Sequence, residues 1–186
     1  MSPFPLGILA ASGVNAEAGA FDLLETATLT SSASSVSFTN LANYSGYKHL
    51  QVRSITRGSN SDLWSAVFVR FNSDSGNNYA DHLLRATDTN IFATAVTSRT
   101  NIGYETAGNA AVSGAYGSSV IDILDPFSSS KNTNFKCLWG RLPNGDDTIA
   151  FGSGVYLSTA ALSTIDFTNT ANFVAGTRFS LYGIKG

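Results

Sequence analysis

The feature of this sequence that most restricts its fold is a series of short apolar runs separated by clusters of small polar residues. The clearest example is WSAVFVRFNSDSGNNY, Trp64–Tyr79, in which an apolar-rich run ends at Phe71 and a new run starts at Tyr79. Apolar residues at alternate positions predict a half-buried strand. Between the runs, Asp74–Asn77 supplies residues that tolerate the positive φ of tight reversals. We therefore expect two antiparallel strands joined through this loop into a hairpin.

The same kind of pattern runs from Phe21 to the end of the chain. Strand-like runs recur at spacings of roughly 8–15 residues, about nine or ten in all, and no stretch sustains a helical period. The least regular region is Phe92–Ala115, where we expect a long loop with one strand near Ile102. Gly152 and Gly154 suggest a β-bulge. The predicted fold is all-β: two antiparallel sheets packed face to face in a jelly-roll-like sandwich.

The first 20 residues differ from the rest, so we divide the chain into an arm and linker, 1–20, and a β-sandwich domain, 21–186. The arm has a short apolar patch followed by small residues, and it has little to bury itself against locally. No Lys or Arg precedes Lys48, which argues against a targeting segment. We expect the arm to bind a neighbouring subunit; the alternative is an edge strand folded onto its own domain. The predicted contact residues are Phe4, Leu6, Ile8 and Leu9.

The composition narrows the classes of function. Charged residues make up 13% of the 186 residues, about half the usual share, so Ser, Thr, Asn and Gly must build the surface. Such a surface suits a protein packed against other subunits, or an extracellular particle. A net charge of −2 indicates no general affinity for nucleic acid or for anionic membranes. The single cysteine, Cys137, leaves no intrachain disulfide, and no apolar run approaches the roughly 20 residues needed to cross a bilayer.

No combination of residues predicts a catalytic site, a cofactor or a metal. His49 and His82 lack Cys, Asp or Glu partners at a metal-binding spacing, and there is no G-x-S-x-G motif. The loop around Asp74 faintly resembles a calcium loop but lacks the terminal bidentate Glu, and turn chemistry explains the same residues. Alternation puts Asp122 on the face opposite Ile121 and Ile123, and Asp125 with Pro126 is better interpreted as a strand-ending turn than as half of a glycosidase pair.

Aromatic residues offer one candidate binding surface. Aromatic planes stack on pyranose rings, so a set of them could line a face that binds glycans. The alternative is that they belong to the core or to subunit contacts, as aromatics in sandwiches commonly do. The candidate glycan contacts are Trp64, Tyr79, Tyr104 and Tyr116.

Several strings, taken together, resemble a family of virion proteins of tailed bacteriophages, common in phages of aquatic bacteria. They cover nearly the whole chain: FPLGILAASG, YKHLQVRSITR, VRFNSDSGNNYADHLL, SSVIDILDP and FSLYGIKG. The most specific parts are Tyr47–Leu50, Arg70–Asn72 and Leu181–Gly186. The resemblance implies a β-rich structural component of the virion. It provides no motif for a catalytic site, so no functional residue is transferred.

These observations lead to an expected function and to alternatives. We expect a non-enzymatic virion structural protein, above all a capsid decoration or cement protein attached through its N-terminal arm to other virion proteins, and a homotrimer. The alternative is a tail, neck or fibre component that binds host-surface glycans. A glycan-degrading enzyme would need two acidic side chains facing each other across a cleft, about 5–10 Å apart. Only the resemblance disfavours a cellular carbohydrate-binding module.

Overall fold

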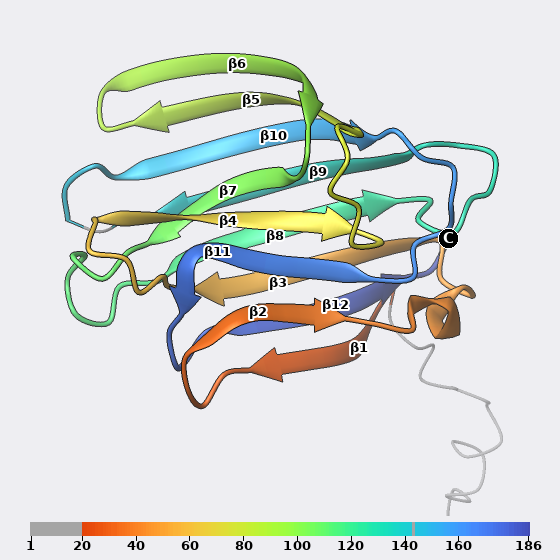
Figure 1. The fold of residues 1–186 in the computed structure, drawn as a ribbon, viewed down its shortest axis with the longest axis horizontal. Helices are drawn as coiled ribbons and strands as arrows, with labels where there is room; N and C mark the ends of the chain where they lie inside the picture. The colour runs from red at the N-terminus through yellow and green to blue at the C-terminus, as the bar shows by residue number, and fades with distance from the viewer. Residues whose placement is uncertain (1–19, 143) are drawn as a thin grey trace, which may run out of the picture.

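The structure, a computed structural model, describes residues 20–142 and 144–186 (Figure 1). The predicted arm contacts Phe4, Leu6, Ile8 and Leu9 lie outside these residues, so their binding to a neighbour stays a prediction. The described chain forms one short 3₁₀ helix, Leu41–Tyr44, and twelve strands. The strands are β1 Phe21–Thr28, β2 Ala33–Phe38, β3 His49–Thr56, β4 Trp64–Phe71, β5 Tyr79–Thr87, β6 Asn90–Arg99, β7 Ile102–Ala107, β8 Gly117–Leu124, β9 Thr133–Arg141, β10 Thr148–Tyr156, β11 Ile165–Phe173 and β12 Arg178–Ile184.

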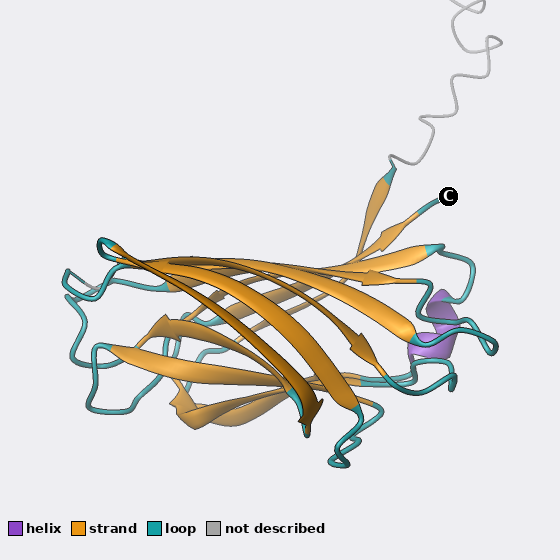
Figure 2. Ribbon diagram, turned by 90° about the horizontal axis from the view of Figure 1, so that it is seen from above, coloured by secondary structure: helices purple, strands orange, loops and turns teal. Residues whose placement is uncertain are grey.

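The strands form two sheets of unequal width that pack as a sandwich, and Figure 2 shows the two layers from the side. The eight-stranded sheet has the order β1-β12-β3-β8-β9-β10-β5-β6, and the four-stranded sheet has the order β2-β11-β4-β7. Neighbouring strands within each sheet are antiparallel. The predicted all-β antiparallel sandwich is confirmed.

The connectivity is that of a jelly roll with two added hairpins. Without β5–β6 and β9–β10, the sheets read β1-β12-β3-β8 and β2-β11-β4-β7. With those hairpins left out, every connection along the chain changes sheet except the one from β4 to β7. This is the eight-stranded pattern of two Greek keys. Both added hairpins extend the larger sheet, which is why that sheet outgrows its partner.

The core lies between the sheets and follows the predicted alternation. Val67, Val69 and Phe71 of β4 are fully buried, while Trp64 and Arg70 lie on the opposite face. An aromatic cluster at one end links both sheets, because the Phe71 ring lies 5.8 Å from that of Tyr156 between centroids. Such edge-to-face contacts add to the free energy gained by burying the rings.

The predicted hairpin of β4 and β5 is wrong, although both strands start where expected. β4 pairs with β11 and β7, whereas β5 pairs with β10 and β6 in the other sheet. The loop between them therefore crosses from one layer to the other. Its positive φ values occur at Asn72 and Ser73, just after β4. The alternation of apolar residues predicts which face of a strand is buried, but it does not predict which strands pair with it.

Two further expectations fail near the edge of the large sheet. In the region predicted as a loop, the strand expected near Ile102 is present as β7, but most of a second, ten-residue strand, β6, was not expected. Only residues 100–101 and 108–115 of that region lie outside strands. β5 and β6 form the real hairpin, closed by Asp88 and Thr89 between Thr87 and its partner Asn90. β10 has no bulge at Gly152 or Gly154. Gly154 is instead required by close packing, since a Cβ there would lie 2.4 Å from the Ala80 carbonyl oxygen.

Candidate functional site

A cleft of about 580 Å³ lies where the larger sheet extends past the smaller one. β4 and β7 line one side of the cleft, and β5 and β6 line the other. An adjoining hollow of about 390 Å³ shares Trp64, Arg85 and Glu105 with it. Clefts of this size are typical of small-molecule sites. The lining residues that matter below are Trp64 from β4, Glu105 from β7, Arg85 from β5, and Thr94, Ser98 and Arg99 from β6.

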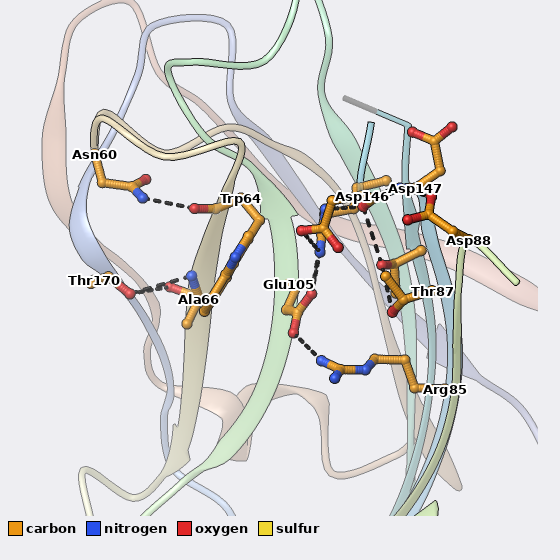
Figure 3. A network of polar contacts seen from close by, with 12 residues as sticks. Asn60, Trp64, Ala66, Arg85, Thr87, Asp88, Glu105, Asp146, Asp147 and Thr170 are labelled. Carbon is orange, nitrogen blue, oxygen red and sulfur yellow. Dashed lines mark hydrogen bonds and ion pairs between the residues drawn. The ribbon is translucent and has the colours of Figure 1, made fainter. Parts of the chain in front are cut away.

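Glu105 connects the two sides of the cleft through both of its carboxylate oxygens (Figure 3). Its Oε1 accepts a hydrogen bond from Arg85 Nη1 at 2.7 Å, and its Oε2 accepts one from Arg141 Nη2 at 2.8 Å. Arg141, whose side chain is only 2% exposed, also pairs with Asp146 at 3.1 Å. Charge-assisted bonds of this kind are about twice as strong as neutral ones. The small sheet is thereby tied to β5 and β9 of the large sheet.

Aromatic rings lie against these guanidinium groups. Arg141 Cζ lies 6.0 Å from the centroid of the Trp64 ring, and Arg85 Cζ lies 5.1 Å from that of Phe92. Trp64 remains 42% exposed although it opens a strand, and Asn60 Nδ2 fixes its backbone by donating to its carbonyl at 2.7 Å. The other tryptophan, Trp139, is buried, so Trp64 supplies the one exposed indole, and it lies beside the cleft.

The cleft contains polar groups that the protein does not use itself. The Nε of Arg85 is buried and has no hydrogen-bond partner among the described residues. The side chains of Asn77, Thr94 and Ser98 are exposed, and they too have no hydrogen-bond partner among the described residues. A bound molecule would find donors and acceptors on several sides.

The three arginines around the cleft are balanced by three acidic side chains. Arg85 and Arg141 face Glu105 and Asp146, and Arg99 Nη1 lies 3.3 Å from Asp81 Oδ2. Burial raises the pKa of the Asp81 carboxyl above its ordinary value, although Arg99 acts in the opposite direction. The cleft therefore has polar groups without a strong net charge.

Of the four predicted glycan contacts, two are corrected by their burial. Tyr79 is 1% exposed, and its hydroxyl is engaged by the backbone of Phe71. Tyr104 reaches the wall of the cleft but is only 3% exposed, and its hydroxyl lies 3.2 Å from Ser54 Oγ. Neither can offer a ring face to a sugar. Burial also raises the pKa of both phenols. Both tyrosines occupy strand positions that face the core. The neighbouring residues in the sequence did not predict this orientation.

Tyr116 lies elsewhere, at the end of the 108–116 loop. It is half-buried, and its hydroxyl donates to the Ala175 carbonyl at 2.8 Å. Arg57 holds the same loop with hydrogen bonds to the carbonyls of Asn109, Ala111, Val112 and Ala115. Trp64 is thus the one predicted glycan contact that the structure places, exposed, in the cleft.

Sequence reasoning missed Arg85, Glu105 and Arg141. Glu105 lies 20 and 36 residues from its two arginine partners, so no local spacing could indicate the cluster. Glu105 also fell in the region expected to be a loop. A charged residue within an apolar alternation, as Arg141 is at the end of β9, was the only available signal.

The Asp74 loop is satisfied by its own hydrogen bonds. Asp74 Oδ1 accepts from the Gly76 backbone, and Oδ2 accepts from Asn78 and from the Tyr156 hydroxyl. These bonds lower the pKa of the Asp74 carboxyl. Within residues 20–142 and 144–186, no three His, Cys, Asp or Glu side chains gather as metal ligands would. None of the helices in that part of the chain is long and apolar enough to span a bilayer.

Comparisons with protein-family models, with curated proteins and with solved structures give no match. Function must therefore be inferred from the cleft and from the surfaces around it.

Proposed function

We propose that this protein is a non-enzymatic attachment protein of a tailed-phage particle, and that it binds a neutral saccharide of the host surface through the Trp64 cleft. The observation that carries the proposal is the half-exposed indole of Trp64 at a cleft braced by paired charges. The virion setting comes from the sequence resemblance described above. The jelly-roll architecture is compatible with it, since capsid and lectin domains share this architecture, although a fold alone does not specify a function.

The chemistry of the cleft suits a polyhydroxyl ligand. One face of a pyranose ring is apolar and packs on an indole, while its hydroxyl groups need donors and acceptors around the rim. Trp64 supplies the first, and Arg85, Thr94 and Ser98 supply the second. Because Arg85 and Arg99 are already paired with carboxylates, little attraction remains for an anionic sugar.

The carboxylates of the cleft support binding rather than catalysis. A glycosidase needs one acid that can donate a proton and a second carboxylate facing it. Both oxygens of Glu105 accept hydrogen bonds from guanidinium groups, and Asp146 is paired with Arg141. These acids brace the cleft walls, which favours a protein that attaches without turnover.

The capsid decoration role remains a second candidate, favoured by a different surface. A row of apolar side chains crosses the outer face of the large sheet, formed by Val120, Leu138, Phe151, Leu84 and Ala93 on five adjacent strands. Leu138, Phe151 and Leu84 are between 48% and 56% exposed. Exposed patches of this kind commonly mark protein interfaces. A decoration protein would use such surfaces on the shell and would not need the cleft.

Binding to a panel of neutral, uronic-acid and sulfated polysaccharides tests the proposal. We expect a neutral polysaccharide to bind best, and Trp64→Ala to weaken that binding at least tenfold, about 1.4 kcal/mol. Calorimetry gives the affinity. Fluorescence gives a second readout, because the only other tryptophan, Trp139, is buried.

Phe151→Ala is the matched control, since it removes an exposed aromatic ring on the outer face of the sheet and outside the cleft. It should bind as tightly as the unaltered protein. The proposal fails if no polysaccharide in the panel binds, or if Trp64→Ala and Phe151→Ala have the same effect.

A further inference from the structure

The free edge of β6 is the strongest unexplained feature outside the cleft. We infer that β6 pairs edge to edge with β6 of a second copy of this chain, antiparallel and about a two-fold axis, so that one sheet runs through both copies. This contact does not depend on saccharide binding. It rests on the backbone of β6, on the other sheet edges and on the apolar row that ends there.

β6 presents a long edge with no partner among the described residues. It is the last strand of the eight-stranded sheet, and β5 pairs with it on one side only (Figure 1). Within the described ranges, no backbone hydrogen bond from residues 90–99 reaches an element other than β5. Such N–H and C=O groups are a template for another extended chain.

The other three edges are shorter or more charged than β6. β1 contains Asp22 and Glu25 and a bulge, and β2 has only six residues. β7 is also six residues long, and its Glu105 is tied to the hairpin above it. β6 has ten residues, and Asn90–Ser98 contains neither a charge nor a proline. Its one bulge lies between Val96 and Arg99, so Asn90–Val96 forms a regular edge of seven residues. Short strands, charges and bulges are the usual devices that prevent edge pairing.

The second copy is favoured as occupant because the edge is self-complementary. An antiparallel pair about a two-fold axis keeps the outer face of each sheet on the same side. Ala93 ends the apolar row Val120–Leu138–Phe151–Leu84–Ala93, so pairing would continue this row directly into the second copy. Small Ala93 and Ala95 alternate with the larger Phe92 and Val96, which leaves room for opposing side chains.

The pairing would also place two clefts side by side. Thr94, Ser98 and Arg99 of β6 line the cleft, so the contact would hold that wall in place from its far side. If the clefts bind a polymeric ligand, two linked sites would increase its avidity without any new contact.

Molar mass in solution, measured by light scattering at several micromolar concentrations, tests the inference. We expect the mass of two chains. The variant with Ala93→Lys and Ala95→Lys should have the mass of one chain, because both positions are exposed and charges there would face their copies. Leu23→Lys, on the exposed outer edge β1, is the matched control and should remain a dimer.

Cross-linking gives a second test that does not depend on the folding of the lysine variant. Ala93→Cys and Ala95→Cys are each oxidised in dilute solution, and at least one should form a disulfide-linked dimer. Native Cys137 is buried and should not contribute. The inference is overturned by a single-chain or three-chain mass for the unaltered protein, by a dimer that survives both lysines, or by no cross-linked dimer from either cysteine.

Discussion

Single residues connect the two layers at the cleft, and Glu105 is the principal one. Its partner Arg141 has a side chain that is almost fully buried, so its charge depends on Glu105 and Asp146 for compensation. Removing one member of such a pair leaves an uncompensated charge in a low-dielectric site, which is more costly than the pair is stabilising. Glu105 is bonded to Arg85 directly, and its other partner Arg141 lies 6.0 Å from the centroid of the Trp64 ring.

Glu105→Gln should lower the free energy of unfolding by about 3 kcal/mol. Urea denaturation followed by circular dichroism measures the change. Glu25→Gln, at an exposed position of β1, is the control and should alter stability by less than about 0.5 kcal/mol. Equal stability of the two variants would show that Glu105 does not tie the sheets together.

At this scale the sequence was informative only where a signal was local. The pattern WSAVFVRF put Trp64 opposite the buried face, and that is where it lies. Tyr79 and Tyr104 carry the same side chain type as Tyr116, but tertiary position alone makes the first two part of the core. The Glu105 cluster joins three strands, so nothing in a short window could predict it.

Among the strands, β10 shows how closely the large sheet is packed. It carries Gly152 and Gly154, and the two have different surroundings. A Cβ on Gly154 would lie 2.4 Å from both the Ala80 carbonyl oxygen and the Phe135 ring, whereas at Gly152 the nearest atom is 3.7 Å away. Neither glycine is at a positive φ in β10, so only packing distinguishes them.

Gly154→Ala should therefore destabilise the protein by about 1–3 kcal/mol through overpacking. Gly152→Ala is the matched control, in the same strand and with the same added methyl group, and its midpoint of denaturation should hardly move. Thermal or urea denaturation measures both. A similar loss in the two variants would contradict the close packing seen only at Gly154.

Element positions were largely predictable, but pairings were not. Most strand boundaries follow from alternation and from turn residues, as in the β9–β10 hairpin, where Asn144, Gly145 and Asp146 have positive φ. β4 and β5 were paired in error because a seven-residue loop can close a hairpin or cross between layers. β6 was missed because its exposed Thr and Ala residues on both faces resemble a loop.

For the molecule as a whole, one continuous core lies between the sheets and includes the only thiol. Cys137 on β9 is buried, and burial raises its pKa above the ordinary value. The thiolate is the reactive form of cysteine. Burial therefore protects Cys137 twice, because it blocks access of reagents and keeps the thiol protonated.

Native protein at pH 8 should therefore react with a chromogenic thiol reagent only as fast as the core opens, whereas urea-denatured protein should react at once. A Ser130→Cys variant adds an exposed thiol, so one thiol per chain should react rapidly in the native state. Rapid reaction of the unaltered native protein would mean that the two layers do not exclude solvent from their core.

The pairing of β1 with β12 also decides how the molecule would be oriented on any support. Phe21 lies opposite Ile184, and the Lys185 amide donates to the Ala20 carbonyl at 3.2 Å, so the polypeptide enters and leaves the sandwich at one corner. β1 and β6 are opposite borders of the same sheet. A tether before Phe21 and a protein fused after Gly186 would both be attached at this corner. Either attachment would leave the Trp64 cleft at the opposite end of the molecule, pointing away from the point of attachment.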